Sequence, residues 1–349
     1  MPTASDLGER ALIQRITGRL TAPAWVLVGP GDDAAVVEPQ RGTLDVLTTD
    51  AQVEGVHFDH RFMPPDAIGH RALAVNLSDL AAMGARPRMA LLSLVLPGAL
   101  DVAIVDGILD GMLRVAESHH VAIVGGNISR SPGPLMIDVT AIGSIGRRRV
   151  LTRRGARPGD LVYVTGTVGD AAVGLESLRE RADLKVRPYT KAVGADTNDV
   201  GADLQVGPAE QRFLYPEARV RDGMLLASNR AATACMDLSD GLADGVRQIA
   251  EASGVGMSID AEALPVTGEV RRWHEARGGH PLEKAVAGGD DYELLFTVRP
   301  SRLGRLRSVQ RLVGTLQLTR IGVVTRERAV VVRYSDGTRE LPPGFEHFS

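Results

Sequence analysis

Short apolar runs alternate with segments of helical periodicity along the whole chain, and this alternation limits the possible folds most strongly. Apolar runs of about four to eight residues are typical of strands, whereas apolar residues spaced three and four apart are typical of helices. The predicted strands lie at 44–49, 90–96, 121–124, 135–142, 161–165, 292–298, 319–324 and 329–333. The predicted helices lie at 66–83, 101–118, 216–228 and 240–252. The pattern predicts a layered, mixed α/β (α+β) chain.

The chain is long enough, at 349 residues, for about two domains. An arginine-rich stretch, RRRVLTRRGARPGD at 147–160, marks the predicted join between an N-terminal domain, 1–148, and a C-terminal domain, 149–349. Such a charge run is usually a solvated loop, although guanidinium groups also suit phosphate oxygens. Between residues 181 and 211 the sequence turns polar and loses periodicity, which predicts a long mobile loop or a partly disordered insertion.

Composition excludes several classes of protein. A net charge of -3 and 4% aromatic residues disfavour general nucleic-acid binding. The single cysteine, Cys235, permits no intramolecular disulfide and favours a reducing cytoplasm. The first ten residues lack the apolar core of a signal peptide, and apolar stretches such as 89–96 are too short to cross a membrane. We therefore expect a cytoplasmic protein with neither nucleic-acid nor membrane partners.

Carboxylates recur at the ends of the apolar runs. Asp79 interrupts the apolar stripe of the helix at 66–83, where an uncompensated charge is costly. The others are Asp32 and Asp33 in GPGDDAAVV, Asp50 in LTTD, Asp237 and Asp240 in MDLSDG, and Asp290 and Asp291 in GGDDYE. Each one alone is explained by a turn or a cap. Together they would repel one another unless they bound divalent cations such as Mg²⁺, which also bind phosphates.

Well-known nucleotide and metal motifs are missing from the sequence. It contains neither the GxxxxGK[ST] of P-loop proteins nor the motif set of protein kinases. One cysteine cannot build a thiolate zinc site. The histidines other than His57 are expected to be surface or capping residues. Glycine pairs at 125–126 and 288–289 would allow the backbone to approach a phosphate closely.

Nine stretches carry a resemblance to a known family. They are GPGDDAAVV, TTDAQVEGVHF, RALAVNLSDLAAMGARP, VGGN, LTRRGARPGD, VYVTGTVGDAAVGL, MDLSDGLADG, GGDDYELLFTV and GFEHF, and they span nearly the whole chain. In them the chain resembles the thiamine-monophosphate kinase family, which is related to aminoimidazole ribonucleotide synthetase. The resemblance implies a two-domain PurM-like fold, with N-terminal domains that bind ATP and magnesium and pair through strands in a homodimer. The implied reaction converts ATP and thiamine monophosphate into ADP and thiamine diphosphate, with several Mg²⁺ ions.

The resemblance also assigns roles motif by motif. The implied metal ligands are Asp33, Thr48, Thr49, Asp50, Asp79, Asp237 and Asp240, with Asn127 at a further ligand position. The implied ATP contacts are Gly126, Asn127, Arg153 and Ser239. The implied contacts to thiamine monophosphate are His57, Asp290 and Phe345, with Phe345 stacking on a ring. No general base is implied, because a phosphate monoester with a second pKa of about 6 is already ionised at neutral pH. Asp32 is expected only to bridge water or to cap its turn.

Two positions depart from the family pattern. Asn127 stands where an aspartate is expected, and a neutral amide oxygen is a weaker metal ligand than a carboxylate. Asp290 stands where a glutamate is frequent, which shortens the reach towards substrate.

Three other functions stay open. The first is a related ATP-dependent synthetase or activator, although such relatives carry a cysteine near the N-terminus or in a C-terminal tail, and Cys235 lies mid-chain. The second is a metal-dependent phosphohydrolase that uses the same acids. The third is a non-catalytic nucleotide-binding module, for which Asn127 is the only indication.

Overall fold

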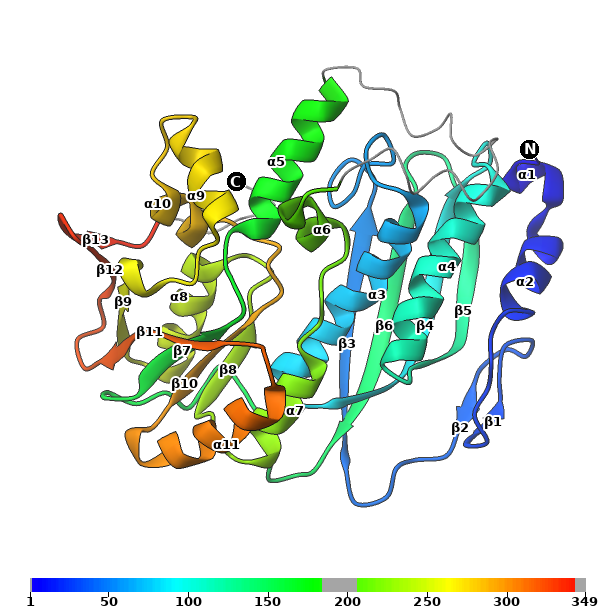
Figure 1. Ribbon diagram of the computed structural model, residues 1–349. Coiled ribbons are helices and arrows are strands. Elements are labelled where there is room, and N and C mark those ends of the chain that lie inside the picture. Colours follow the sequence, from blue (N-terminus) through cyan, green and yellow to red (C-terminus); the bar gives the residue numbers. More distant parts are fainter. Residues whose placement is uncertain (1, 184–205, 343–349) are drawn as a thin grey trace. The chain divides into compact units, whose positions relative to one another are not determined.

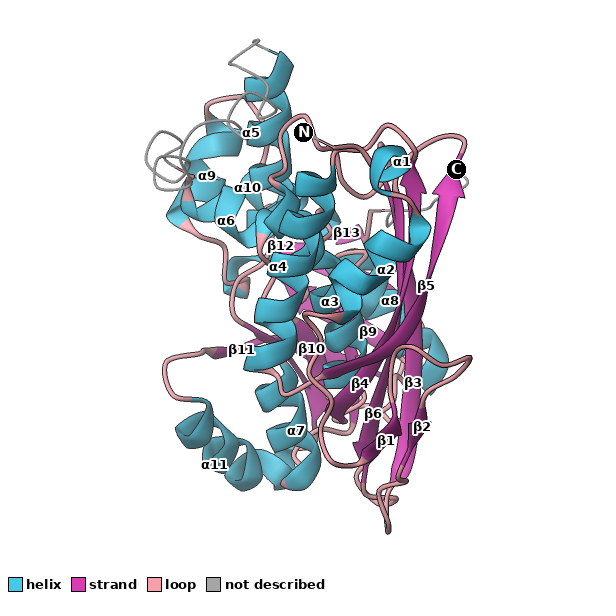
Figure 2. Ribbon diagram, turned by 90° about the vertical axis from the view of Figure 1, so that its right-hand side faces the viewer, coloured by secondary structure: helices cyan, strands magenta, loops and turns pink. Residues whose placement is uncertain are grey.

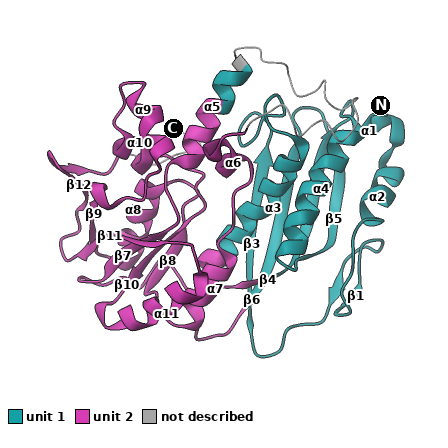
Figure 3. Ribbon diagram, in the orientation of Figure 1, with its two compact units in different colours: residues 1–80, 87–144, 178–205 teal, residues 81–86, 145–177, 206–349 magenta. Residues whose placement is uncertain are grey.

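The computed structural model describes residues 2–183 and 206–342 (Figure 1). The chain forms two compact units (Figure 3). Unit 1 comprises Met1–Leu80, Pro87–Ser144 and Leu178–Gln205, and unit 2 comprises Ala81–Arg86, Ile145–Ser177 and Val206–Ser349. The functional domains proposed at 1–148 and 149–349 stay a prediction.

Unit 1 contains a four-stranded sheet with the order β3-β6-β4-β5. Its strands are β3 (Leu44–Val53), β4 (Arg86–Pro97), β5 (Ala122–Ser131) and β6 (Met136–Ile145). Helices α3 (Pro65–Ala82) and α4 (Val102–Ser118) lie along one face of the sheet (Figure 2). Helix α4 begins after Asp101, whose side chain accepts the backbone N–H of Ala103.

The N-terminal segment forms helices α1 (Ala4–Leu7) and α2 (Glu9–Thr17), followed by the short hairpin strands β1 (Val26–Val28) and β2 (Val36–Val37). Arg15 ties α2 to α4, because its guanidinium donates to both carboxylate oxygens of Asp106, at 2.6 and 2.5 Å. No helix in the described part of the chain is long and apolar enough to cross a membrane.

Unit 2 contains a seven-stranded sheet with the order β13-β12-β9-β11-β7-β10-β8. Its strands are β7 (Leu161–Thr165), β8 (Ala234–Asp237), β9 (Gly256–Asp260), β10 (Leu294–Val298), β11 (Leu318–Thr325), β12 (Val330–Tyr334) and β13 (Gly337–Glu340). Neighbouring strands are antiparallel except β12 and β9, which are parallel.

The helices that begin in unit 2 are α5 (Asp170–Asp183), α6 (Pro208–Leu214), α7 (Val220–Ser228), α8 (Leu242–Ser253), α9 (Gly268–Glu275), α10 (Pro281–Ala287) and α11 (Leu303–Val313). Helix α8 packs against the sheet, where its buried Val246 and Ile249 join a core that includes Val162 and Leu295. Helix α7 packs against α11.

The predicted α/β class is confirmed, and each predicted strand and helix has a counterpart in the structure. The loop predicted at 181–211 is wrong at both ends, since residues 181–183 belong to α5 and residues 208–211 begin α6; residues 184–205 lie outside the described part. Helix α3 is buried around nearly its whole circumference, not along one stripe, and only His70 and Asp79 between Ala67 and Ala82 are half-buried.

Candidate functional site

Two candidate metal ligands in unit 1 lie on the face of β3 that meets helix α3. The hydroxyl of Thr48 donates a hydrogen bond to the carboxylate of Asp79. Asp50 follows Thr48 by two residues and therefore projects from the same face, roughly 7 Å further along the strand. Asp79 is half-buried inside an otherwise buried helix. The strand thus presents a hydroxyl and a carboxylate towards Asp79, the acid in the C-terminal part of α3.

Thr49 projects from the opposite face of β3. Its hydroxyl lies 3.2 Å from Asp138 Oδ1, 3.1 Å from Thr140 Oγ1 and 3.2 Å from the carbonyl oxygen of Val139, all on β6. The structure therefore brings Thr48 to Asp79 but separates Thr49 from both. The strict alternation of side chains along a strand causes this separation.

Gly126 and Asn127 lie on β5, at the other edge of the same sheet. In the parallel pairing of β4 and β5, Gly126 is opposite Leu92 and Asn127 is opposite Ser93. A Cβ atom at Gly126 would approach the carbonyl oxygen of Leu92 to 1.9 Å, so this position requires glycine. Strands β6 and β4 separate β5 from β3, which places the two edges roughly 14 Å apart. Within one chain, Asn127 is not a neighbour of Thr48 and Asp79.

The remaining candidates of unit 1 lie in loops. Asp32 Oδ1 accepts the backbone N–H of Asp33 at 2.8 Å within the turn. Asp33 is exposed between β1 and β2. The backbone N–H of Val53 donates to His57 Nδ1 at 3.1 Å, which leaves the proton of the neutral ring on Nε2.

The motifs DLSDG and GGDDYE of unit 2 interlock through their backbones. Asp290 N–H donates to the carbonyl of Ser239 at 2.7 Å, and Tyr292 N–H donates to the carbonyl of Leu238 at 3.0 Å. Leu238 N–H donates to the carbonyl of Glu293 at 2.8 Å. Candidate metal and ATP residues and the candidate substrate residue Asp290 therefore share one hydrogen-bonded frame, which extends the β8–β10 pairing.

Glycine makes this frame possible at Gly241. Its φ is +91°, and a Cβ atom there would lie 2.1 Å from the carbonyl oxygen of Gly288. The backbones of the DLSDG and GGDDYE motifs therefore lie so close together that no side chain fits between them at Gly241.

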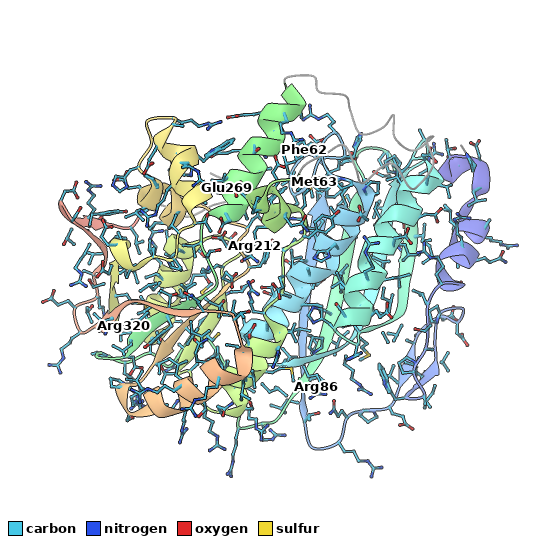
Figure 4. All side chains as sticks on the ribbon, in the orientation of Figure 1. Phe62, Met63, Arg86, Arg212, Glu269 and Arg320 are labelled. Carbon is cyan, nitrogen blue, oxygen red and sulfur yellow. The ribbon has the colours of Figure 1, made fainter. Side chains whose placement is uncertain are left out.

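Two further acids of GGDDYE are buried and hold the frame. Asp291 is 3% exposed and accepts the N–H groups of Gly169 and Ala171 at the start of α5. Burial raises the pKa of Asp291 well above its usual range, and the bond from Gly169 opposes that rise. Glu293 is fully buried and binds Arg212, Arg219 and the hydroxyl of Thr165 (Figure 4 labels Arg212). Sequence reasoning placed Asp291 only among the acids that would gather around divalent cations, and it gave Glu293 no role.

Arg153 is exposed and donates to the side-chain oxygen of Gln248 on α8. Gln248 in turn donates to Asp244, one helical turn after the DLSDG motif. Phe345 lies outside the described residues.

The donor set fits Mg²⁺ better than a softer metal. Carboxylate and hydroxyl oxygens are the ligands of a hard cation, and protein sites for Mg²⁺ commonly supply one or two carboxylates while phosphates and waters complete the shell. Within 2–183 and 206–342, no three His, Cys, Asp or Glu side chains lie close enough together to hold a metal ion alone.

Known proteins resemble the chain over nearly its full length. The family model "AIR synthase related protein, N-terminal domain" matches residues 31–145, and its C-terminal counterpart matches residues 157–335. Thiamine-monophosphate kinase of Aquifex aeolicus (strain VF5) is 37% identical over 343 residues, covering 98% of this chain and 99% of that protein.

Two solved structures resemble the fold. Thiamine-monophosphate kinase from Stenotrophomonas maltophilia K279a has a TM-score of 0.78 and 36% identity, covering 95% of this chain and 96% of that one. AaThiL complexed with AMPPCP and TMP has a TM-score of 0.73 and 36% identity, covering 98% of this chain and 97% of that one. The two-domain PurM-like fold is confirmed by these structures, and the chain belongs to the thiamine-monophosphate kinase family.

Proposed function

We propose that this chain transfers the γ-phosphoryl group of ATP directly to thiamine monophosphate, forming ADP and thiamine diphosphate. The observation that carries the proposal is the interlocked frame of DLSDG and GGDDYE, which fixes candidate ATP and substrate residues relative to each other. Full-length relatives that are thiamine-monophosphate kinases, and a related structure that holds AMPPCP and TMP, support the same reaction.

The nucleophile is a phosphate oxygen of thiamine monophosphate, already ionised near neutral pH because its second pKa is about 6. No side chain needs to remove a proton, so the chemical obstacle is repulsion between two anions. In unit 1, Thr48, Asp50 and Asp79 would hold Mg²⁺, and in unit 2 Asp237 and Asp240 would do so; Mg²⁺ neutralises phosphate charge when bound. Arg153 would add a fixed positive charge, and the remaining rate enhancement comes from alignment of the two phosphates.

The direct test follows both products in one reaction. Purified protein is incubated with ATP, Mg²⁺ and thiamine monophosphate, and ADP and thiamine diphosphate are quantified together. Equal appearance of the two supports the kinase. ADP without thiamine diphosphate overturns it in favour of an activator with another acceptor or a phosphohydrolase, and no ADP indicates a non-catalytic module.

A homodimer is part of the proposal. Leu47 is 68% exposed on β3 and Leu91 is 40% exposed on β4, so the sheet face opposite α3 and α4 presents apolar side chains to solvent. The separation of Gly126 and Asn127 from Thr48 and Asp79 also supports pairing, since a second copy could bring one edge to the other. A cytoplasmic location is likewise proposed, on the support of a single, buried cysteine.

Mixing two inactive variants is expected to restore activity if each site uses β3 and α3 of one chain and β5 of its partner. Asp79→Asn damages the first set, and Asn127→Trp, at an exposed position, blocks the second without a packing cost. Random pairing then gives about a quarter of wild-type turnover, because half of the dimers carry one intact site. Activity of the unfolded and refolded mixture is the measurement. A mixture as inactive as each variant alone would contradict the shared site.

Asn127→Asp is expected to lower the Mg²⁺ concentration for half-maximal activity several-fold. A carboxylate binds a hard cation more strongly than an amide oxygen does, and the amide of Asn127 now donates to Ser129 Oγ at 3.0 Å. The measurement is a Mg²⁺ titration at saturating substrates. Ser129→Ala is the control, because it removes the same hydrogen bond without adding charge. An unchanged titration would remove residue 127 from the metal site.

A further inference from the structure

The segment from Asp290 to Glu293 has an unusual backbone. Asp290 and Tyr292 are left-handed, with φ values of +68° and +51°, although neither is a glycine. Residues other than glycine rarely adopt this backbone conformation, and it persists only where surrounding contacts stabilise it. The intervening Asp291 turns inward and is buried, while Asp290 stays half-buried.

Asp291 supplies one of the restraints. Its Oδ2 accepts the N–H of Gly169 at 2.8 Å, and its Oδ1 faces the N–H of Ala171 at 3.4 Å. The Asp291 side chain thus satisfies backbone donors at the N-terminus of α5. Backbone bonds from Asp290 to Ser239 and from Tyr292 to Leu238 restrain the residues on either side.

Tyr292 supplies the other restraint. It is 7% exposed, and its hydroxyl donates to Asp290 Oδ1 at 3.2 Å. This contact limits the orientations of the Asp290 carboxylate. Asp290 also has one methylene fewer than the glutamate that is frequent at this position in the family.

We propose that Asp291 and Tyr292 are positioning residues that orient the Asp290 carboxylate towards the cationic thiamine moiety of thiamine monophosphate. The proposal rests on the proposed function, in which Asp290 contacts that substrate. Asp291 fixes the left-handed backbone, and the hydroxyl of Tyr292 fixes the side chain. Loss of either restraint is not expected to change ATP binding, because Asp290 contacts thiamine monophosphate and not ATP in the proposed function.

The test compares Asp291→Asn and Tyr292→Phe with the wild type in steady-state kinetics. The KM for thiamine monophosphate is expected to rise about tenfold in Asp291→Asn and about fivefold in Tyr292→Phe, the effect of losing one hydrogen bond. The KM for ATP is expected to stay within about twofold in both variants. Tyr292→Phe keeps the buried ring, so it remains informative if Asp291→Asn folds poorly.

Asp160→Asn is the matched control for a merely structural effect. Asp160 is 2% exposed and accepts the N–H of Arg157 at 3.1 Å and the hydroxyl of Thr233 at 2.8 Å. It lies before β7, at the end of the sheet away from Asp290. This variant is expected to lose stability as Asp291→Asn does, while both KM values stay unchanged.

A double-mutant cycle with Asp290→Ala decides whether Tyr292 acts through Asp290. In that background Tyr292→Phe is expected to leave the KM for thiamine monophosphate unchanged. The same rise in both backgrounds, or unchanged KM values in Tyr292→Phe, would overturn the proposal while the kinase stands. A wild-type protein that forms no thiamine diphosphate would instead overturn the proposed function, and this inference with it.

Discussion

Asp79→Asn is expected to lower turnover about 100- to 1,000-fold while the fold is retained. The asparagine oxygen can still accept the hydrogen bond from Thr48, so the contact between β3 and α3 survives. What is lost is a negative charge that would hold Mg²⁺ against the phosphates of ATP. The measurements are kcat at saturating substrates and the melting temperature.

The control for this prediction is Asp66→Asn in the same helix. Asp66 accepts a bond from Arg114 at 2.6 Å, and its side chain is 32% exposed. Its variant should keep wild-type turnover. The metal assignment of Asp79 would be wrong if Asp79→Asn retained near-normal turnover at limiting Mg²⁺, or if Asp66→Asn lost as much activity.

Local pattern was sufficient to predict much of unit 1. The helical spacing around Asp79 predicts an acid directed into packed surroundings, and LTTD predicts only an acid at the end of a strand. The shared face of Thr48 and Asp50 comes from the structure. The structure joins these observations through the bond between Thr48 and Asp79. Both predictions concern the place of a residue within one regular element, which follows from the local sequence pattern. The bond itself joins two elements, β3 and α3.

Sheet order could not be predicted in the same way. Asn127 follows a predicted strand just as Asp50 does, yet β5 and β3 lie at opposite edges of the sheet. Which strands become neighbours depends on long-range pairing that one sequence does not reveal. The family resemblance assigned Asn127 and Asp50 to the same role, metal binding. Within one chain, the fold places these two residues on strands at opposite edges of the sheet.

The buried acids of GGDDYE show a second limit of sequence reasoning. Asp291 meets Gly169, and Glu293 meets Arg212 and Arg219, all more than seventy residues earlier in the chain. In the sequence Asp291 looks like a further member of an acidic loop, whereas Glu293 falls within the strand predicted at 292–298. The one available signal was the apolar run after them, since a carboxylate that directly precedes a buried strand needs a partner.

Glu293→Gln is expected to produce the largest loss of stability. Glu293 is fully buried, and Arg219, with a side chain 7% exposed, donates to it at 2.7 and 2.6 Å. Burial lowers the pKa of Arg219, but the bonds and the charge of Glu293 outweigh that effect and raise it. A glutamine leaves this buried guanidinium without its counter-charge, which costs about 3–5 kcal/mol of unfolding free energy. The melting temperature should fall by roughly 10 °C, as measured by thermal and urea unfolding.

Glu283→Gln makes the same substitution at an exposed ion pair of unit 2. Glu283 binds Arg339, and both side chains are 46% exposed. Solvent screens such a pair, so the expected loss is about 1 kcal/mol or less. A similar small loss in Glu293→Gln would mean that Arg219 finds another counter-charge, since Glu217 already lies 2.8 Å from its guanidinium. A large loss of stability in Glu293→Gln alone would show that Glu293 anchors the frame that carries Asp290. Glu293 belongs to the same backbone segment as Asp290, and Glu293 itself supplies no reactive group.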